Sequence, residues 1–227
     1  DEATESSYRK AGEKACYEDE VSKQAVMNKV HTAEVQPPKL KYSEKRNVRI
    51  LYIEADEDHV AHQAKGKGGT RCLMPKLIYV HEGIDISRST AKRKVLKNVR
   101  YFGEDCSSED LWLQVAQYIS EQYDEDKIET VYISGDGASW IKQGLKWIDK
   151  SRFVLDNHHL NKYIKVATAH LNDEAIYQGL KDALDWPDKE MASRVFKRIL
   201  ELTENDTKRA AVKDARKYIM NNWDGIA

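Results

Sequence analysis

Two short apolar runs, each ending in an aspartate, stand out in the pattern of hydrophobic and polar positions along this chain. One run reads VRILYIEAD and ends at Asp56, and the other reads IETVYISGD and ends at Asp136. Both are rich in β-branched and aromatic residues and are followed by turn or helix signals. The pattern predicts two buried strands that each deliver a carboxylate to the edge of a sheet.

Similar runs predict the rest of that sheet. The expected strands are Arg49–Ala55, Lys76–His81, Asn98–Phe102, Ile128–Ile133 and Phe153–Asp156. Ser107 begins a capping-box pattern that opens a helix, Ser139–Trp147 forms a second helix, and a third follows Asp156. The order of three strands, helix, strand, helix, strand, helix is typical of an α/β domain with a mixed sheet.

Both ends of the chain have helical patterns without strands. Ser22 is placed to cap a helix at Lys23–His31, which follows a short helix at Ser6–Ala15. Together they are a candidate helix-turn-helix, although any small helical hairpin gives the same pattern. The side chains that could reach bases or phosphates are Lys23, Gln24, Asn28 and Lys29. From residue 172 onward, three apolar stripes at helical spacing predict an all-helical region.

Composition narrows the class of protein. The chain has 227 residues, of which 41% are hydrophobic and 33% charged, and no apolar stretch approaches the length needed to span a bilayer. The first twenty residues are polar throughout, which argues against a secretory signal. Cys16, Cys72 and Cys106 lack the spacing of a zinc site or a disulfide framework, so we expect a cytoplasmic protein.

The net charge of −1 does not by itself favour nucleic acid as a partner, but local charge does. The string SRSTAKRKVLKNVR at 87–100 contains six basic residues and no acid. It is either a solvated hairpin or a strip that contacts phosphates. Its candidate contact residues are Arg88, Lys92, Arg93 and Lys94.

The acidic residues are the candidates for chemistry. Alternation along a strand directs Glu54, Asp56 and Asp58 to the same side, where a cation or solvent would have to relieve their repulsion. Asp136 lies between Gly135 and Gly137, which allow a close approach of backbone or substrate. Simpler roles remain open: a solvated strand end for the first cluster, and a helix cap for Asp136.

Five strings in a fixed order resemble a known family. LYIEADEDHVAHQ, LIYVHEG, LKNVRYFG, VYISGDGASWIKQGL and FVLDNHHLNKYI are similar to the catalytic region of the Lre-type insertion-sequence transposases. The N-terminal string ESSYRKAGEKACYEDEVSKQAVMNKV resembles their helix-turn-helix segment. These bacterial proteins are distant relatives of the Mutator-type DDE transposases. The resemblance covers nearly the whole chain.

The resemblance implies a ribonuclease-H-like core at 45–171. A helix-turn-helix segment at 1–36 would precede this core, and a helical insertion at 172–227 would follow it. The implied activity is metal-dependent cleavage and transfer of DNA strands. The implied partners are double-stranded DNA, at the element ends and the target, and further copies of the same protein assembled on that DNA. No membrane is implied.

The same resemblance assigns residues to roles. Asp56 matches the first acid of the DDE triad and Asp136 the second, and both would hold Mg2+ or Mn2+. Asp156 and His159 match a supporting Cys/Asp-x-x-His motif. No residue matches the glutamate of the triad, so we expect this chain by itself to be inactive. Two alternatives stay open: a non-catalytic DNA-binding or regulatory remnant, and a ribonuclease-H-like nuclease without strand transfer.

Overall fold

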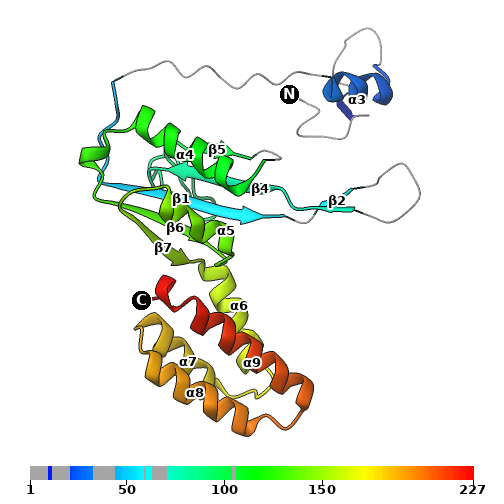
Figure 1. Ribbon diagram of the computed structural model, residues 1–227. Helices are drawn as coiled ribbons and strands as arrows, with labels where there is room; N and C mark the ends of the chain where they lie inside the picture. The colour runs from blue at the N-terminus through cyan, green and yellow to red at the C-terminus, as the bar shows by residue number, and fades with distance from the viewer. Residues whose placement is uncertain (1–9, 12–20, 33–43, 59, 63–70, 104–105) are drawn as a thin grey trace. The chain divides into compact units, whose positions relative to one another are not determined.

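The computed structural model describes residues 10–11, 21–32, 44–58, 60–62, 71–103 and 106–227 (Figure 1). The chain divides into two compact units, Asp1–Lys41 and Tyr42–Ala227. In the first unit, α3 spans Lys23–His31, as the sequence predicts, and the Ser22 hydroxyl accepts a hydrogen bond from the Ala25 amide at 3.2 Å. Apart from residues 10 and 11, the helix predicted at Ser6–Ala15 lies outside the described residues.

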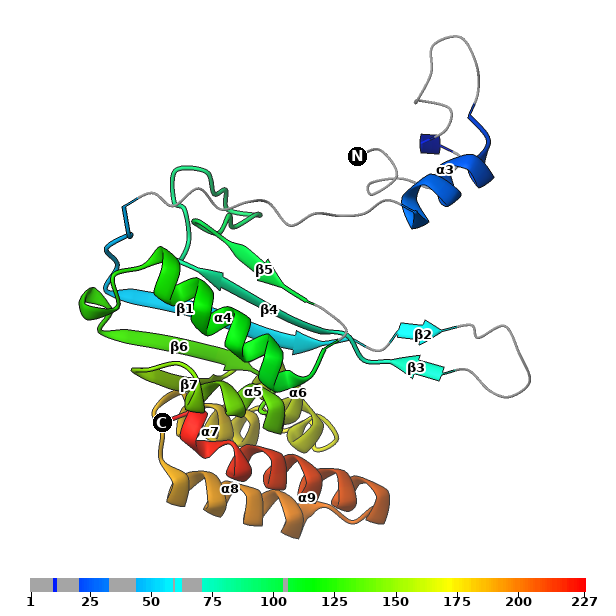
Figure 2. The ribbon, with the colours of Figure 1, turned by 45° about the horizontal axis from the view of Figure 1, so that its top comes forward.

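Five strands of the second unit form one mixed sheet with the order β5-β4-β1-β6-β7 (Figure 2). The strands are β1 at Ile50–Glu57, β4 at Lys76–His81, β5 at Arg100–Phe102, β6 at Thr130–Gly135 and β7 at Ser151–Leu155. β1, β6 and β7 run parallel, whereas β4 is antiparallel to both β1 and β5. The predicted α/β class with a mixed sheet is therefore confirmed.

The structure corrects several predicted boundaries. β6 begins at Thr130 rather than Ile128, because a 3-10 turn at Glu125–Lys127 closes on the Ile128 amide. β5 begins at Arg100 rather than Asn98, and β7 spans Ser151–Leu155. An additional hairpin, β2 at Val60–His62 and β3 at Arg71–Leu73, was not predicted because three-residue strands are too short to show periodicity.

The predicted helix at Ser139–Trp147 is shorter than expected. Only α5, at Ser139–Lys142, is α-helical, and the chain continues as a 3-10 helix at Gln143–Lys146. Gly144 lies in that segment, and a Cβ atom there would meet the Trp112 ring at 2.6 Å. The glycine thus allows an indole ring to pack directly against the backbone of the turn.

The main core lies on one face of the sheet. Leu51, Ile53 and Ala55 point from β1 to this face, and α4, at Ser108–Gln122, covers it with Leu111 and Trp112. As predicted, the Ser107 hydroxyl caps α4 by accepting the Asp110 amide. Alternation places Glu54 and Asp56 on the opposite face, so burying the apolar residues of β1 exposes its acids.

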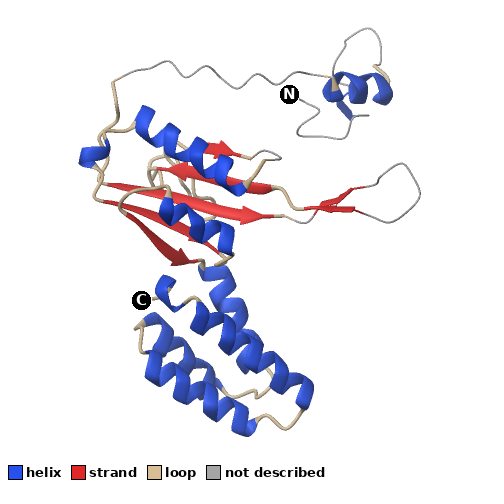
Figure 3. Ribbon diagram, viewed as in Figure 1, coloured by secondary structure: helices blue, strands red, loops and turns tan. Residues whose placement is uncertain are grey.

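The remaining helices form a second, all-helical core beside β7 (Figure 3). They are α6 at Asn157–Thr168, α7 at Glu174–Asp185, α8 at Lys189–Leu202, α9 at Asp206–Asn221 and a 3-10 turn at Trp223–Gly225. The side chains that cap the four α-helices are Asp156, Asp173, Asp188 and Asn205. No helix among the described residues is long and apolar enough to cross a membrane.

Candidate functional site

Asp56 and Asp136 lie at the same end of neighbouring parallel strands. The register of β1 and β6 runs from Ile50 opposite Thr130 to Glu54 opposite Ser134. Continuing that register past Ser134 brings Asp136 beside Asp56. The fold therefore places two aspartates that are far apart in sequence at neighbouring positions of one sheet edge, as the two apolar runs predict.

Each aspartate uses one carboxylate oxygen to fix its own turn. Oδ1 of Asp136 accepts a hydrogen bond from the Ala138 amide at 2.8 Å, and Oδ1 of Asp56 accepts one from the Glu57 amide at 2.9 Å. Among the described residues, the second oxygen of each carboxylate has no hydrogen-bond partner. Asp56 is exposed and Asp136 is half-buried. Within the described parts of the chain, the edge thus presents two carboxylate oxygens without a partner, one at the end of each strand.

Contacts from α9 and the following turn hold the loop of Asp136. The Tyr218 hydroxyl donates to the Asp136 carbonyl at 2.6 Å. Gly137 has φ of +87°, and a Cβ atom there would lie 2.2 Å from Oδ1 of Asn222. Burial raises the pKa of Tyr218, and the charges of Asp136 and Asp156 raise it further, so both carboxylates lie near this hydroxyl. The loop is therefore fixed by the helical core as well as by the sheet.

Asp156 and His159 form a hydrogen-bonded pair at the same edge. The Asp156 amide donates to the Gly135 carbonyl at 2.9 Å, which joins the end of β7 to the residue before Asp136. The Asp156 carboxylate caps α6 through the His158 and His159 amides, and Nδ1 of His159 lies 2.5 Å from its Oδ2. The capping role expected of Asp156 is confirmed. His158 is exposed and His159 is half-buried.

The pKa of Asp156 lies below its ordinary value. Burial alone would raise this pKa, but hydrogen bonds from the His159 ring and from two backbone amides stabilise the charged carboxylate and outweigh burial. A depressed pKa in the folded state stabilises the fold at neutral pH. That contribution is lost as the pH falls below about 4, where the unfolded chain takes up the proton.

Replacing Asp156 with Asn tests this pair. Asparagine still caps a helix, but it loses the charge, so we expect a loss of about 1 kcal/mol in the free energy of unfolding at pH 7. The difference between wild type and Asp156→Asn should shrink as the pH falls toward 3. Urea denaturation at the two pH values measures it. An equal difference at both values would contradict the charged hydrogen bond.

A second network, which the sequence analysis missed, lies beside Asp56 on the exposed face. Glu54 on β1 accepts a hydrogen bond from the Tyr79 hydroxyl at 2.5 Å, and its other oxygen lies 3.2 Å from Nε2 of His81. His81 is only 4% exposed, and its Nδ1 accepts a hydrogen bond from the Gly83 amide. Nε2 therefore carries the ring proton and donates a hydrogen bond to Glu54. The hydrogen bond from His81 lowers the pKa of Glu54. Burial raises this pKa, but the hydrogen bond from Tyr79 lowers it further, so the net shift is downward. A half-exposed, charged carboxylate therefore lies next to the acidic edge.

The predicted DNA-contacting residues belong to α3 and to the strip at 87–100. On α3, all four are exposed, and Gln24 donates to Oδ1 of Asn28 at 2.9 Å, so these two amides pair with each other. In the strip at 87–100, the four candidate cations are exposed, and a bridge between Ile84 and Leu96 gives the segment a hairpin-like base. The strip follows His81, which pairs with Tyr52 near the start of β1. It therefore lies at the end of the sheet opposite Asp56, which the sequence could not show.

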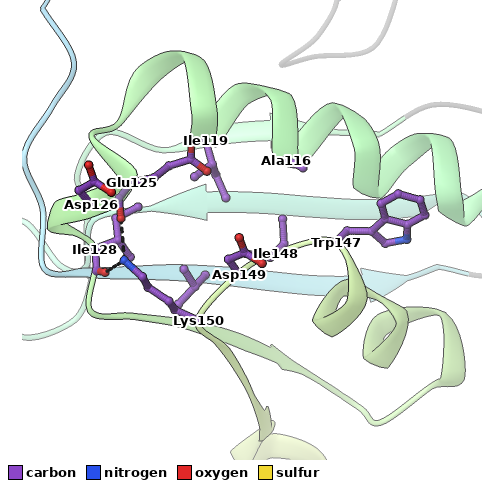
Figure 4. A pocket seen from close by; sticks show the side chains of 10 residues that line it. Ala116, Ile119, Glu125, Asp126, Ile128, Trp147, Ile148, Asp149 and Lys150 are labelled. Carbon is purple, nitrogen blue, oxygen red and sulfur yellow. Dashed lines mark hydrogen bonds between the residues drawn. The ribbon is translucent and has the colours of Figure 1, made fainter.

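A hollow on the α4 side of the sheet lies away from Asp56 and Asp136 (Figure 4). Its lining includes Ile128 and Lys150, which lie at the beginnings of the parallel strands. The Lys150 ammonium donates to the carbonyls of Glu125 and Ile128 at 2.8 and 2.7 Å. This lysine therefore serves a structural role, and the hollow is separate from the acidic edge.

The acidic edge has the donors for part of a metal site. Among the described residues, no group of three His, Cys, Asp or Glu side chains is arranged to hold a metal ion. Two aspartate oxygens remain, and a shallow hollow beside Asp56 is lined by Asp56, Asp58 and Lys76. Mg2+ commonly binds one or two carboxylates and keeps several waters, so this pair fits a weakly held hard cation.

Comparison with known proteins places the whole chain in a family. Residues 1–227 match the model described as "Uncharacterised protein family (UPF0236)". Two UPF0236 proteins of Caldanaerobacter subterraneus subsp. tengcongensis are each 46% identical over 99% of this chain, which covers 46% of one and 44% of the other. A UPF0236 protein from the vanSb 3′ region of Streptococcus gallolyticus is 28% identical over 89% of the chain and 43% of its own length. The chain spans about half the length of these relatives, and it belongs to the UPF0236 family.

Proposed function

We propose that this chain is part of a DDE-type transposase with a ribonuclease-H-like core, which cleaves and joins DNA strands at an acidic edge formed by Asp56 and Asp136. The observation that carries the proposal is the position of two aspartates at the same end of adjacent parallel strands. Ends of parallel strands are where α/β sheets commonly place their ligands. The sequence resemblance to Lre-type transposases names the same two residues.

The sheet order supports the proposed core. The central strand β1 is flanked by the antiparallel β4 and the parallel β6, with β5 and β7 at the edges. That topology is the one expected of a ribonuclease-H-like sheet whose first and fourth strands carry acids. In this chain the added hairpin β2–β3 precedes β4, so the acid-bearing strands correspond to β1 and β6.

The name of another relative adds support of a different kind. One UPF0236 protein of Caldanaerobacter, 45% identical to this chain, has a name that joins eleven designations. Repeated copies of one gene would produce such a name. Copying a gene to many places in a genome is what a mobile element does. We therefore favour a transposase over a nuclease that cuts without strand transfer.

The residues of the site have different roles in the proposed reaction. Asp56 and Asp136 would hold divalent ions, which supply Lewis-acid activation of an attacking hydroxyl and stabilisation of the leaving oxygen. Asp156 holds His159 and the start of α6 at the same edge. Tyr218 and Gly137 fix the backbone that carries Asp136. The rest of the triad would come from parts of the full-length protein that correspond to the remainder of the relatives.

Metal-dependent DNA binding tests the proposal without requiring turnover. In the absence of a divalent cation, the two aspartates repel phosphate, and a bound cation turns this repulsion into attraction. Adding Mn2+ should therefore tighten duplex binding by wild type by roughly tenfold, about 1.4 kcal/mol. Asp136→Asn should bind more tightly than wild type without metal and respond little to Mn2+. Fluorescence anisotropy with a labelled duplex measures both.

Asp149→Asn is the matched control, because Asp149 is an exposed aspartate that lines the remote hollow in Figure 4. It should keep the full response to Mn2+. An equal Mn2+ response in wild type and Asp136→Asn would contradict the proposed site. A strand-transfer assay, which detects joining of a cut 3′ end to a second duplex, separates the transposase from the nuclease.

A further inference from the structure

The outer face of α6 is unusual among the helices of the second core because it carries cations and amides without any acid. None of the twelve residues of α6 is Asp or Glu. Lys162 and Lys165 are both exposed. They line one shallow surface hollow with four further residues, which are Asn157, His158, Asn161 and Val166.

The two lysines lack the ion-pair partners that several cations of α7 and α8 have. On α7, Lys181 pairs with Asp185 at 2.8 Å. On α8, Arg194 lies 3.9 Å from Glu190, and Arg198 lies 3.6 Å from Glu201. Within the described parts of the chain, Lys162 and Lys165 form no ion pair. The positive charge of α6 is therefore available to an external anion, whereas much of the charge on α7 and α8 is balanced locally.

The position of α6 relates this charge to the acidic edge. The helix follows directly on β7 (Figures 1 and 2). Its cap is Asp156, whose amide donates to the carbonyl of Gly135, the residue before Asp136. Lys162 and Lys165 lie six and nine residues into the helix from its cap, about 9 and 14 Å along its axis. The strip at 87–100 lies beyond the other end of β4, roughly 20 Å from Asp56 by the length of that strand. Of these two basic surfaces, α6 is the one that starts at the carboxylates.

We infer that the outer face of α6 contacts the phosphate backbone of duplex DNA as the duplex leaves the acidic edge. This inference rests on the proposed function for its substrate, and it assigns to α6 a role separate from metal binding. Successive phosphates of one DNA strand are spaced about 3.4 Å along the helix axis, so side chains about 5.4 Å apart, one helical turn, can reach separate phosphates. Lysine ammonium groups at this spacing can each neutralise one phosphate and release condensed counterions. Such contacts hold the duplex without reading its sequence.

Salt-dependent binding of the full chain to a duplex tests the inference. For wild type, the logarithm of the association constant should fall linearly with the logarithm of salt concentration. Lys162→Gln/Lys165→Gln removes two phosphate contacts, so the slope should become less steep by about 1.8. Binding to unrelated duplexes should weaken by the same factor. Lys162→Arg/Lys165→Arg should restore the wild-type slope, because arginine also neutralises phosphate.

Lys213→Gln/Lys217→Gln provides the matched control. These lysines are exposed on α9, form no ion pair within the described residues, and line a different surface hollow. Their loss changes the net charge equally but should leave the slope nearly unchanged. Equal losses in the two variants would overturn the inference, because they would indicate diffuse charge rather than a contact at α6.

The same titration separates failure of this inference from failure of the proposed function. If the α6 variant keeps the wild-type slope while Mn2+ still tightens binding through Asp136, the inference is wrong and the acidic site stands. If wild type binds no duplex at about 50 mM salt, where phosphate contacts are strong, both are wrong. Circular dichroism of each variant checks that the helices are intact before slopes are compared.

Discussion

Alanine in place of Gly137 should destabilise the second unit by about 2–5 kcal/mol. Two effects add to give this range. Gly137 has φ of +87°, a left-handed conformation that costs a residue with a Cβ atom about 1–2 kcal/mol. The new Cβ atom would also lie 2.2 Å from Oδ1 of Asn222, and crowding a packed site typically costs 1–3 kcal/mol. The free energy of unfolding from urea titration measures the sum.

The cost is large because Asn222 has little freedom to move away. It is 6% exposed, and its side-chain amide donates to the Tyr218 carbonyl at 3.0 Å. Tyr218 in turn donates its hydroxyl to the Asp136 carbonyl. The substitution would therefore disturb the contact between the helical core and the loop that positions Asp136.

Gly179→Ala is the control for this experiment. Gly179 lies inside α7, and no atom lies within 4 Å of the position its Cβ would occupy. Alanine favours a helix by about 1 kcal/mol over glycine, so the unfolding free energy should rise. If the unfolding free energy of Gly137→Ala lies within about 0.5 kcal/mol of the wild-type value, the turn tolerates a side chain and is not held rigidly.

Sequence patterns predicted elements whose causes are local. Lys23–His31 and Lys76–His81 match the predicted bounds, because a serine cap defines one and apolar alternation defines the other. The carboxylates at the ends of β1 and β6 were also predictable, since each follows its own apolar run. The short hairpin β2–β3 and the 3-10 continuation of α5 were not, because neither leaves a periodic signal in so few residues.

Contacts that depend on strand direction could not be predicted from the sequence. Glu54 meets Tyr79 and His81 only because β4 runs antiparallel to β1 and pairs Glu54 with Tyr79. The same reversal places the strip at 87–100 at the far end of the sheet from Asp56. A signal for the network did exist, since Tyr79 and His81 alternate with the buried Ile78 and Val80. The two polar residues therefore share the face of Glu54.

Mn2+ binding by wild type, Asp56→Asn, Asp136→Asn and the double variant tests most directly whether the two aspartates act as one site. We expect weak binding by wild type, because hard cations prefer more oxygen ligands than two carboxylates supply. Each single substitution should lower the affinity by at least roughly tenfold, since losing even an outer-shell partner of a metal typically does so. The spectrum of free Mn2+ in electron paramagnetic resonance gives each affinity.

The double-mutant cycle is the decisive comparison. If Asp56 and Asp136 hold the same cation, the double variant should bind little more weakly than either single variant, with a coupling energy of about 1–2 kcal/mol. Asp149→Asn, the remote control, should bind like wild type. Additive losses, or single variants that retain wild-type affinity, would show that the two aspartates do not share a metal ion and would contradict the proposed site.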